Sequence, residues 1–333
     1  MLLSTKIFRF SRYLSTTTRV WSQQLKSEEK VKDSGKIHQK EKDPNIIFHK
    51  PLNINFTKLP LKSKELSKLI FLEIKKTLKR QDQIIVEGNQ LIKEAIQSNI
   101  KLNYLLFSHV DKITDIVNVM GTNTKHVNFL KAPQHDLTFY SVLTTCPGVI
   151  GIFDKPKEIQ PKTNPLPITI ICDNLREPNN LGSVIRLANA LPVTKVLLPK
   201  GNADPWDVKA IRGSSGSIFY IPTEHSLEWK QIEEDQTIDD SIILIADNNA
   251  SKYPSNSILC YDKIPKELIE NKQIYVLLGG ETHGISEEAK DFAFKRNWKV
   301  IHIPIDSIVD SLNTSNALAI ILFELRRMLS NSY

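Results

Sequence analysis

The 333-residue sequence has few cysteines, no long apolar run and no dinucleotide-binding motif, and each absence excludes a class of protein. Its three cysteines, Cys146, Cys172 and Cys260, are far apart and form no CxxC pair, so we expect neither a disulfide framework nor a metal site. No uninterrupted apolar run reaches the roughly 18 residues of a membrane-spanning helix, so no membrane span is expected. No GxGxxG motif opens a strand–helix unit, which leaves a nucleotide-dependent oxidoreductase poorly supported.

The composition is that of a folded chain with a basic excess. Apolar residues make up 41% of the sequence, and its length accommodates two domains of ordinary size plus a tail. The formal net charge is +7, which is compatible with a polyanionic partner such as RNA. Basic residues near the N-terminus contribute to that figure, so the charge alone is a weak signal.

Residues 1–26 have the pattern of a mitochondrial targeting sequence. All their charges are basic, and the first acidic residue of the chain is Glu28. Four apolar side chains recur on one helical face: Leu3, Ile7, Phe10 and Leu14. A hydroxyl-rich run, residues 15–18, follows them. A basic, amphipathic and acid-free segment is typical of a presequence and predicts the mitochondrial matrix; the alternative is a disordered basic tail.

Two folded domains are expected after this segment. Residues 27–60 are mostly charged and predict a disordered linker. Residues 61–155 predict a small α/β domain, because apolar residues at helical spacing between Leu66 and Leu78 precede several strand and helix signals. The expected strands of this domain are residues 84–86, 104–107 and 149–153, with a helix at residues 89–97. A proline-rich linker, residues 154–167, follows.

Residues 165–330 alternate between strand and helix signals, which predicts a largely parallel sheet. The expected strands are residues 166–171, 195–198, 218–221, 242–246, 274–278 and 300–303. The expected helices are residues 182–190, 207–211, 227–232, a short one near 266, 286–294 and 311–328.

A first polar turn lies between a buried strand and a helix. The apolar run of residues 166–171 predicts the strand, and the turn that follows it leads through Asn180 into Gly182. Ligands bind at such carboxyl ends of strands in α/β sheets. Arg176 and Arg186 flank the turn where the apolar pattern does not require them. The alternative is that the asparagine caps the helix and the arginines are solvated.

A second and a third polar turn occur later in the chain. The second follows Leu278 and contains Gly279, Gly280 and the carboxylate of Glu281, although a tight turn alone would explain the glycines. The third precedes the last helix and contains Ser311 and Asn313, which would otherwise serve as a cap and a first-turn residue. That helix is apolar almost all round, so we expect it to be buried or at a subunit interface. Burying a polar residue beside it would require hydrogen-bonding partners, which favours a site.

The three turns resemble, in order and spacing, the motifs of the SpoU/TrmH branch of the SPOUT methyltransferases. The resemblance implies an α/β fold: a C-terminal knotted α/β SPOUT methyltransferase domain with a smaller N-terminal L30e-like α/β domain that binds RNA. It also implies a homodimer that methylates a ribose 2′-hydroxyl of RNA with S-adenosylmethionine. The sequence departs from the family pattern at Asn179, where a glycine is usual, and at Ser307, near another expected glycine.

The resemblance also implies roles for individual residues. Arg186 takes the proton-accepting position of the family, but a guanidinium is protonated at neutral pH, so we expect it to bind phosphate and stabilise developing negative charge. The residues expected to orient Arg186 and the ribose are Asn180, Glu281, Ser311 and Asn313. The residues expected to hold the cofactor are Leu278, Gly279, Gly280, Gly284, Ile303, Ile305 and Leu312.

The expected substrate is a ribose, taken to be that of a guanosine, in mitochondrial large-subunit rRNA, with a role in ribosome assembly. The run at residues 171–176, the presequence pattern and the third motif resemble the mitochondrial members of the family most closely. Two alternatives remain open from the sequence: a tRNA substrate, and a ribosome-assembly factor of the same fold without catalytic activity.

Overall fold

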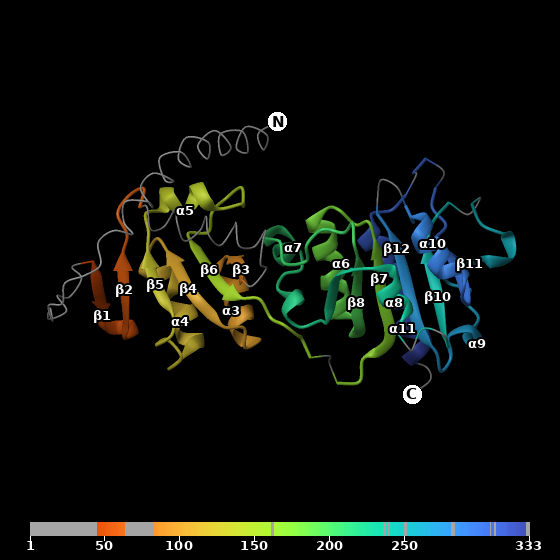
Figure 1. The fold of residues 1–333 in the computed structure, drawn as a ribbon, viewed down its shortest axis with the longest axis horizontal. Coiled ribbons are helices and arrows are strands. Elements are labelled where there is room, and N and C mark those ends of the chain that lie inside the picture. The colour runs from red at the N-terminus through yellow and green to blue at the C-terminus, as the bar shows by residue number, and fades with distance from the viewer. Residues whose placement is uncertain are drawn as a thin grey trace, which may run out of the picture. The chain divides into compact units, whose positions relative to one another are not determined.

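The structure, a computed structural model, describes residues 45–63, 83–160, 163–235, 238, 240–249, 252–280, 284–306, 308–309 and 311–330. The expected targeting sequence, the helix expected between Leu66 and Leu78, and Glu281 lie outside these residues. The described chain contains two sheets, and most of their strands are labelled in Figure 1. None of its helices has the length and apolar character needed to cross a membrane.

The first sheet has six strands in the order β1-β2-β5-β4-β6-β3. They are β1 (Ile46–His49), β2 (Ile54–Lys58), β3 (Gln83–Glu87), β4 (Leu102–Phe107), β5 (Asn128–Lys131) and β6 (Val149–Asp154). Its helical elements are η1 (Lys50–Leu52), α3 (Asn89–Gln97), η2 (Val110–Ile113), α4 (Thr114–Met120) and α5 (Gln134–Tyr140). β2, β5 and β4 pair in parallel, whereas β6 runs antiparallel to both β4 and β3. β6 is buried along almost its whole length because its alternating side chains enter two different core clusters: Val149 and Phe153 belong to one, and Ile150 and Ile152 to the other.

This domain begins earlier in the chain than the sequence indicated. Residues 45–58, which their charged surroundings assigned to the linker, form β1 and β2 of the sheet, so that part of the linker interpretation is wrong. The signal was weak because only Ile54 and Phe56 alternate into the core, at 3% and 5% exposure. The strands expected at residues 84–86, 104–107 and 149–153 and the helix at residues 89–97 are confirmed by β3, β4, β6 and α3.

The second sheet has seven strands in the order β11-β13-β10-β12-β7-β8-β9, and all its recorded pairings are parallel. They are β7 (Leu166–Asp173), β8 (Val193–Pro199), β9 (Thr223–Leu227), β10 (Ser241–Ala246), β11 (Ile258–Cys260), β12 (Gln273–Gly279) and β13 (Trp298–His302). The helices are α6 (Pro178–Ala190), α7 (Val208–Gly213), η3 (Ser217–Phe219), α8 (Trp229–Glu233), η5 (Ser255–Ser257), α9 (Lys266–Ile269), α10 (Glu287–Phe294) and α11 (Thr314–Ser330).

Both faces of this sheet are covered, which explains why its central strands are apolar without interruption. In β7, Ile170 belongs to one buried cluster and its neighbour Ile171 to another. Side chains of α6 and α11 pack into the first cluster, and side chains of α8 and α10 into the second. Figure 1 shows these helices beside the strands of the parallel sheet. The predicted largely parallel sheet is confirmed, and helices cover both of its faces.

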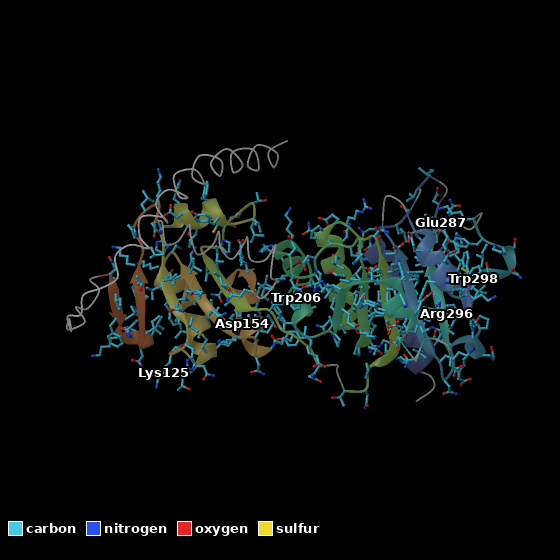
Figure 2. All side chains as sticks on the ribbon, in the orientation of Figure 1. Lys125, Asp154, Trp206, Glu287, Arg296 and Trp298 are labelled. Atoms are coloured by element: carbon cyan, nitrogen blue, oxygen red, sulfur yellow. The ribbon has the colours of Figure 1, made fainter. Side chains whose placement is uncertain are left out.

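One expected strand and two edge strands differ from the sequence interpretation. Residues 218–221 form the turn η3 and the residues after it, because their apolar side chains pack inward; Phe219 stacks on Trp206, labelled in Figure 2, with ring centroids 6.5 Å apart. The strand itself is β9, an edge strand of mostly polar residues that carries little periodic signal. The three-residue edge strand β11 was not predicted either.

Candidate active site

Four neighbouring parallel strands of the second sheet have their carboxyl ends side by side. They are β13, β10, β12 and β7, in that order across the sheet. Hydrogen bonds join these strands beyond their last residues: the Ile303 amide donates to Asn248 Oδ1 at 3.2 Å, and the Gly280 amide donates to the Asp173 carbonyl at 2.8 Å. The loops that follow the strands are thus held side by side, at the edge where α/β sheets bind ligands.

The first polar turn leads into α6, which begins at Pro178 rather than at Gly182. Proline suits the first helical position because its missing N–H would have had no partner there. The helix cap is Glu177, whose carboxylate accepts from the Asn180 amide at 2.8 Å. Asn180 is therefore not the cap, and its side chain serves another contact: Asn180 Oδ1 accepts from Asn313 Nδ2 at 3.3 Å.

The third turn is therefore joined to the first through two asparagine side chains. Asn313 also caps α11, because its Oδ1 accepts from the Ser315 amide at 3.0 Å and from Ser315 Oγ at 2.6 Å. The helix starts at Thr314, three residues after Ser311, so Ser311 is not its cap. Asn313 and Ser311 are both exposed, which corrects the expectation that Asn313 is buried. The bond to Asn180 brings the first and third turns together.

The second turn, residues 279–286, is called the glycine loop below. The Gly284 amide donates to the Gly280 carbonyl at 2.9 Å. A Cβ atom on Gly279 would lie 2.4 Å from the Gly284 carbonyl carbon, and one on Gly280 would lie 2.3 Å from the Asn174 carbonyl oxygen. Backbone meets backbone at both positions, so no other residue fits there without displacing the chain. The described part of this loop is thus packed against the first turn.

Several polar residues that hold these loops were missed by the sequence interpretation. Asp173, the last residue of β7, has 1% exposure, and its Oδ2 accepts from the Ser286 amide at 2.6 Å. Burial raises the pKa of its carboxyl group above the usual range, and the hydrogen bond from Ser286 acts in the opposite direction. A charged residue directly after an apolar run was the available signal, but its partner lies 113 residues later.

A second missed residue, Asn202, supports the first turn from the loop after β8. Its Nδ2 donates to the carbonyl oxygens of Cys172 and Pro199 at 2.6 and 2.8 Å, and its Oδ1 accepts from the Leu175 amide at 2.8 Å. The side chain thereby satisfies backbone groups that the parallel ladder leaves unpaired. Nothing in the local sequence around Asn202 marks this role.

Apolar residues expected to hold the cofactor gather at the same sheet edge. Leu278 and Ile303 are buried, at 2% and 7% exposure, and Ile305 and Leu312 are half-buried against the same core cluster. Leu278 belongs to β12, and the other three lie in the segment between β13 and α11. A pocket for a nucleoside-containing cofactor requires apolar walls and a few backbone groups that can form hydrogen bonds. The strand ends supply both, and the two glycines let the backbone approach the cofactor closely. The residues present therefore fit such a group.

Arg186 is not brought to the Asn180–Asn313 pair within one chain. Six helical residues separate it from Asn180, which turns its position about 240° around the α6 axis and about 9 Å along it. Its side chain is exposed, and within the described part of the chain it forms no hydrogen bond or ion pair. Arg176 is also exposed. The guanidinium of Arg186 therefore projects from a different face of α6.

Comparisons with known proteins agree with this arrangement. Residues 167–323 match the SpoU rRNA Methylase family. The chain is 32% identical over 318 residues to the mitochondrial rRNA methyltransferase 3 of Xenopus laevis, covering 81% of this chain and 75% of that protein. It is 31% identical over 292 residues to the protein of the same name from Homo sapiens, covering 75% of this chain and 69% of that protein.

Solved structures share the fold. The AdoMet-bound rRNA methyltransferase from Sinorhizobium meliloti superimposes with a TM-score of 0.65 at 21% identity, over 82% of this chain and 98% of that chain. The SpoU methyltransferase AviRb from Streptomyces viridochromogenes, in complex with the cofactor AdoMet, gives a TM-score of 0.64 at 21% identity, over 81% of this chain and 99% of that chain. At this level of identity the two structures establish the fold.

Proposed function

Because the chain belongs to the SpoU rRNA methylase family, with the fold of the SPOUT methyltransferases and S-adenosylmethionine as its cofactor, we propose that it methylates a ribose 2′-hydroxyl in mitochondrial large-subunit rRNA. The observation that carries this proposal is the hydrogen bond between Asn180 and Asn313. This bond joins the first and third turns at the carboxyl ends of the strands, where the glycine loop also begins. Residues distant in the sequence therefore form one site.

The substrate class follows from the relatives. The two relatives described above are named as mitochondrial rRNA methyltransferases, which favours rRNA over the alternative of tRNA. Guanosine as the modified nucleoside and a role in ribosome assembly are carried over from the family resemblance. The alternative of an inactive assembly factor is disfavoured because Asn180, Arg186, Glu281, Ser311 and Asn313 are all present. The basic segment of residues 1–26 would direct the protein to the mitochondrial matrix.

The N-terminal α/β domain, which we assign to the L30e-like class, is proposed to bind the RNA. Its strands β2, β5 and β4 are parallel, so their carboxyl ends share one edge. Ser108 follows β4 there, and Lys112 Nζ lies close by, donating to the Pro147 carbonyl at 2.8 Å. The ammonium group of Lys112 places positive charge at this end of the strands, where a phosphate of RNA would be attracted to it.

The cofactor would lie between the glycine loop and the third loop. When bound, S-adenosylmethionine supplies a sulfonium methyl group that a ribose oxygen can attack. The backbone of Gly279 and Gly280 can approach it closely because no side chain intervenes, and Leu278, Ile303 and Leu312 would exclude water from it. Ile305 and Gly284 complete the proposed set.

The remaining site residues would orient the acceptor. Positioning alone can supply much of the acceleration when nucleophile and methyl carbon are held in line. Asn180 and Asn313 fix each other's amide groups, and we assign Ser311 and Glu281 to the same task on the ribose. Arg186 would hold the neighbouring phosphate and stabilise the negative charge that develops on the ribose oxygen.

A homodimer would reconcile the position of Arg186 with this role. Its guanidinium projects from another face of α6 than Asn180, so we propose that the partner's Arg186 completes each site. Exposed apolar side chains near the third loop support a subunit contact: Ile308 is 89% exposed and Phe323, on α11, is 55% exposed. α11 packs against α6, so both helices would belong to one interface. Of the two positions expected for this apolar helix, burial or a subunit interface, the proposal takes the second.

Transfer of tritiated methyl groups tests the proposal. The full chain is incubated with labelled S-adenosylmethionine and either a mitochondrial large-subunit rRNA fragment or tRNA, and the RNA is hydrolysed with alkali. Alkaline cleavage needs a free 2′-hydroxyl, so ribose methylation leaves the label in resistant dinucleotides. We expect that result with rRNA. Label in mononucleotides would indicate base methylation, label in tRNA alone would identify the alternative substrate, and RNA binding without cofactor binding would identify an inactive factor.

Replacing Arg186 tests its assigned role. We expect Arg186→Ala to reduce methyl transfer by about a hundredfold or more, the scale observed when one electrostatic stabiliser is removed from an active site. RNA affinity should stay within a factor of about three, because other basic groups contribute to it. Arg186→Lys should retain an intermediate rate. The control is Lys230→Ala, which removes an exposed basic residue on α8, a helix that packs on the other face of the sheet from α6 and α11. Wild-type rates in Arg186→Ala would reject the assignment.

A further inference from the structure

The two ends of the glycine loop are bonded to Asp173, the last residue of β7. We propose that Asp173 is a positioning residue for methyl transfer, because one residue holds both ends of the loop between Gly280 and Ser286. This inference rests on the proposed role of that loop in holding the cofactor. It adds a residue that contacts neither the ribose nor the methyl donor and acts through the backbone of the loop.

The contacts of Asp173 bracket the loop. At one end, its backbone carbonyl accepts from the Gly280 amide at 2.8 Å. At the other end, its Oδ2 accepts from the Ser286 amide at 2.6 Å. Gly280 and Gly284 form a bridge between these two points. The backbone acceptor is available to any residue at position 173, whereas the second contact requires a short side chain with a charged or polar oxygen.

The carboxylate is not needed to cap the helix that follows. Ser286 is itself the cap of α10, and its hydroxyl oxygen accepts from the Ala289 amide at 3.2 Å. The start of this helix can be found in Figure 2 at the labelled residue Glu287. The bond from Ser286 to Asp173 therefore lies outside the helix, on the loop side of the cap. Its effect is to set where the loop ends relative to β7.

Burial makes this arrangement costly, which argues for a specific use. Asp173 has 1% exposure, and an ionised carboxylate out of contact with water is unfavourable unless it accepts hydrogen bonds. Oδ2 accepts from Ser286, and Oδ1 accepts from Asn174 Nδ2 at 3.0 Å. An apolar side chain at position 173 could end the buried strand without the free-energy cost of desolvating a carboxylate. The carboxylate offers instead two oriented acceptors at the junction of two loops.

Asp173 consequently connects the first loop to the second, as the Asn180–Asn313 pair connects the first to the third. Asn174 follows it in the left-handed conformation, with φ of 56°, and its carbonyl oxygen packs against Gly280. A displacement of the carboxylate would release the end of the glycine loop while leaving the strands paired. The expected consequence is weaker cofactor binding rather than global unfolding.

The test compares three variants of the full chain by calorimetric titration with S-adenosylmethionine. Asp173→Ala should weaken cofactor binding about tenfold or more, the ratio that loss of one charge-assisted hydrogen bond produces. Asp173→Asn keeps one acceptor and should weaken it about threefold. The matched control is Asp136→Ala: Asp136 has 4% exposure, and its Oδ2 accepts from the Lys62 amide at 2.7 Å in the other domain. This control should lose stability without losing cofactor affinity.

Hydrogen exchange supplies a second readout. In Asp173→Ala, the amides of Gly284 to Ser286 should exchange faster than in the wild type, whereas those of β12 and of the later turns of α10 should stay protected. Equal loss of cofactor affinity in Asp173→Ala and Asp136→Ala would indicate general destabilisation and overturn the inference. If Asp173→Ala does not fold, Asp173→Asn decides: wild-type affinity together with wild-type exchange overturns the inference.

The same titration distinguishes failure of the inference from failure of the proposed function. Gly280→Ala perturbs the glycine loop directly, since its Cβ would lie 2.3 Å from the Asn174 carbonyl oxygen. If Gly280→Ala weakens cofactor binding and Asp173→Ala does not, Asp173 is not the positioning residue. If neither variant changes the affinity, the glycine loop does not hold the cofactor, and the proposed site itself is wrong.

Discussion

Replacing Asn313 separates two functions of one side chain. Its Oδ1 caps α11 through Ser315, and its Nδ2 donates to Asn180 across the site. Asn313→Ala removes both contacts. Asn313→Asp keeps an acceptor for the cap but has no proton to donate to Asn180 Oδ1. The two variants should therefore differ in stability and agree in activity.

The magnitudes follow from the contacts. Loss of a helix cap costs about 1 kcal/mol of stability, within a range of about 0.5–2 kcal/mol, so Asn313→Ala should be destabilised by that amount. Asn313→Asp should lie within about 0.5 kcal/mol of the wild type, because aspartate caps as well as asparagine does. α11 remains docked in both variants, because Leu318, Ile321 and Leu322 are buried in the core. Both variants lose the bond to Asn180 that orients the ribose. A misplaced ribose hydroxyl should reduce the methyl-transfer rate of both variants about tenfold to a hundredfold.

Urea denaturation gives the stabilities, and initial rates of methyl transfer at saturating cofactor give the activities. The control is Asn316→Ala, which removes an exposed asparagine one turn further along α11. Wild-type activity in Asn313→Asp would refute the reasoning, because the bond to Asn180 would then be irrelevant to the reaction. Equal destabilisation of the two variants would show that Asn313 does not act as the cap.

Two further predictions concern the glycine loop and the buried carboxyl group of the first domain. In Gly280→Ala, the steric conflict with the Asn174 carbonyl should cost about 1–3 kcal/mol of stability and weaken S-adenosylmethionine binding, as thermal unfolding and calorimetry would measure. Gly121→Ala is the control, because Gly121 has φ of 57° but open space around it; equal cofactor loss in both would contradict the prediction. Burial raises the pKa of Glu87 above its usual 4.5, despite hydrogen bonds from Ser141 and Val142. The contribution of Glu87 to the free energy of unfolding is therefore greatest at pH values below its usual pKa, and it falls as the pH rises through the raised pKa of the folded state. Glutamine does not titrate, so the stability of Glu87→Gln relative to the wild type should increase with pH across that window. Denaturation at a series of pH values would measure this difference, and a difference that is constant or falls with pH would contradict it.

Much of the fold could be predicted because it follows from the pattern of apolar residues within short segments. The apolar run of β7 and the spacing of Val184, Ile185 and Ala188 in α6 follow from burial on two faces of a sheet and on one face of a helix. β9 and β11 could not be predicted, because edge strands bury few side chains and need no apolar pattern. The start of the first sheet was missed because its two inward residues, Ile54 and Phe56, alternate with polar residues in a short segment that follows the charged one.

The site was predictable only in part, and for a related reason. Asn180 and Asn313 carry a family motif, and the structure brings them together. Asp173 and Asn248 act on backbone amides 113 and 55 residues away, so no spacing along the sequence reveals them. The position of Arg186 on another face of α6 follows from helical geometry. The role we propose for it requires a second protomer, which the spacing of residues in one chain does not encode.

In the proposed site, three loops and one guanidinium surround a single methyl donor. The most direct measurement is a crystal structure of the full chain with S-adenosylmethionine bound. We expect the cofactor between the Gly279 and Leu312 loops, with an Arg186 guanidinium, from the same protomer or from its partner, facing the methyl group across a space that accommodates one ribose. A cofactor bound elsewhere, or every Arg186 of the assembly turned away from these loops, would contradict the account.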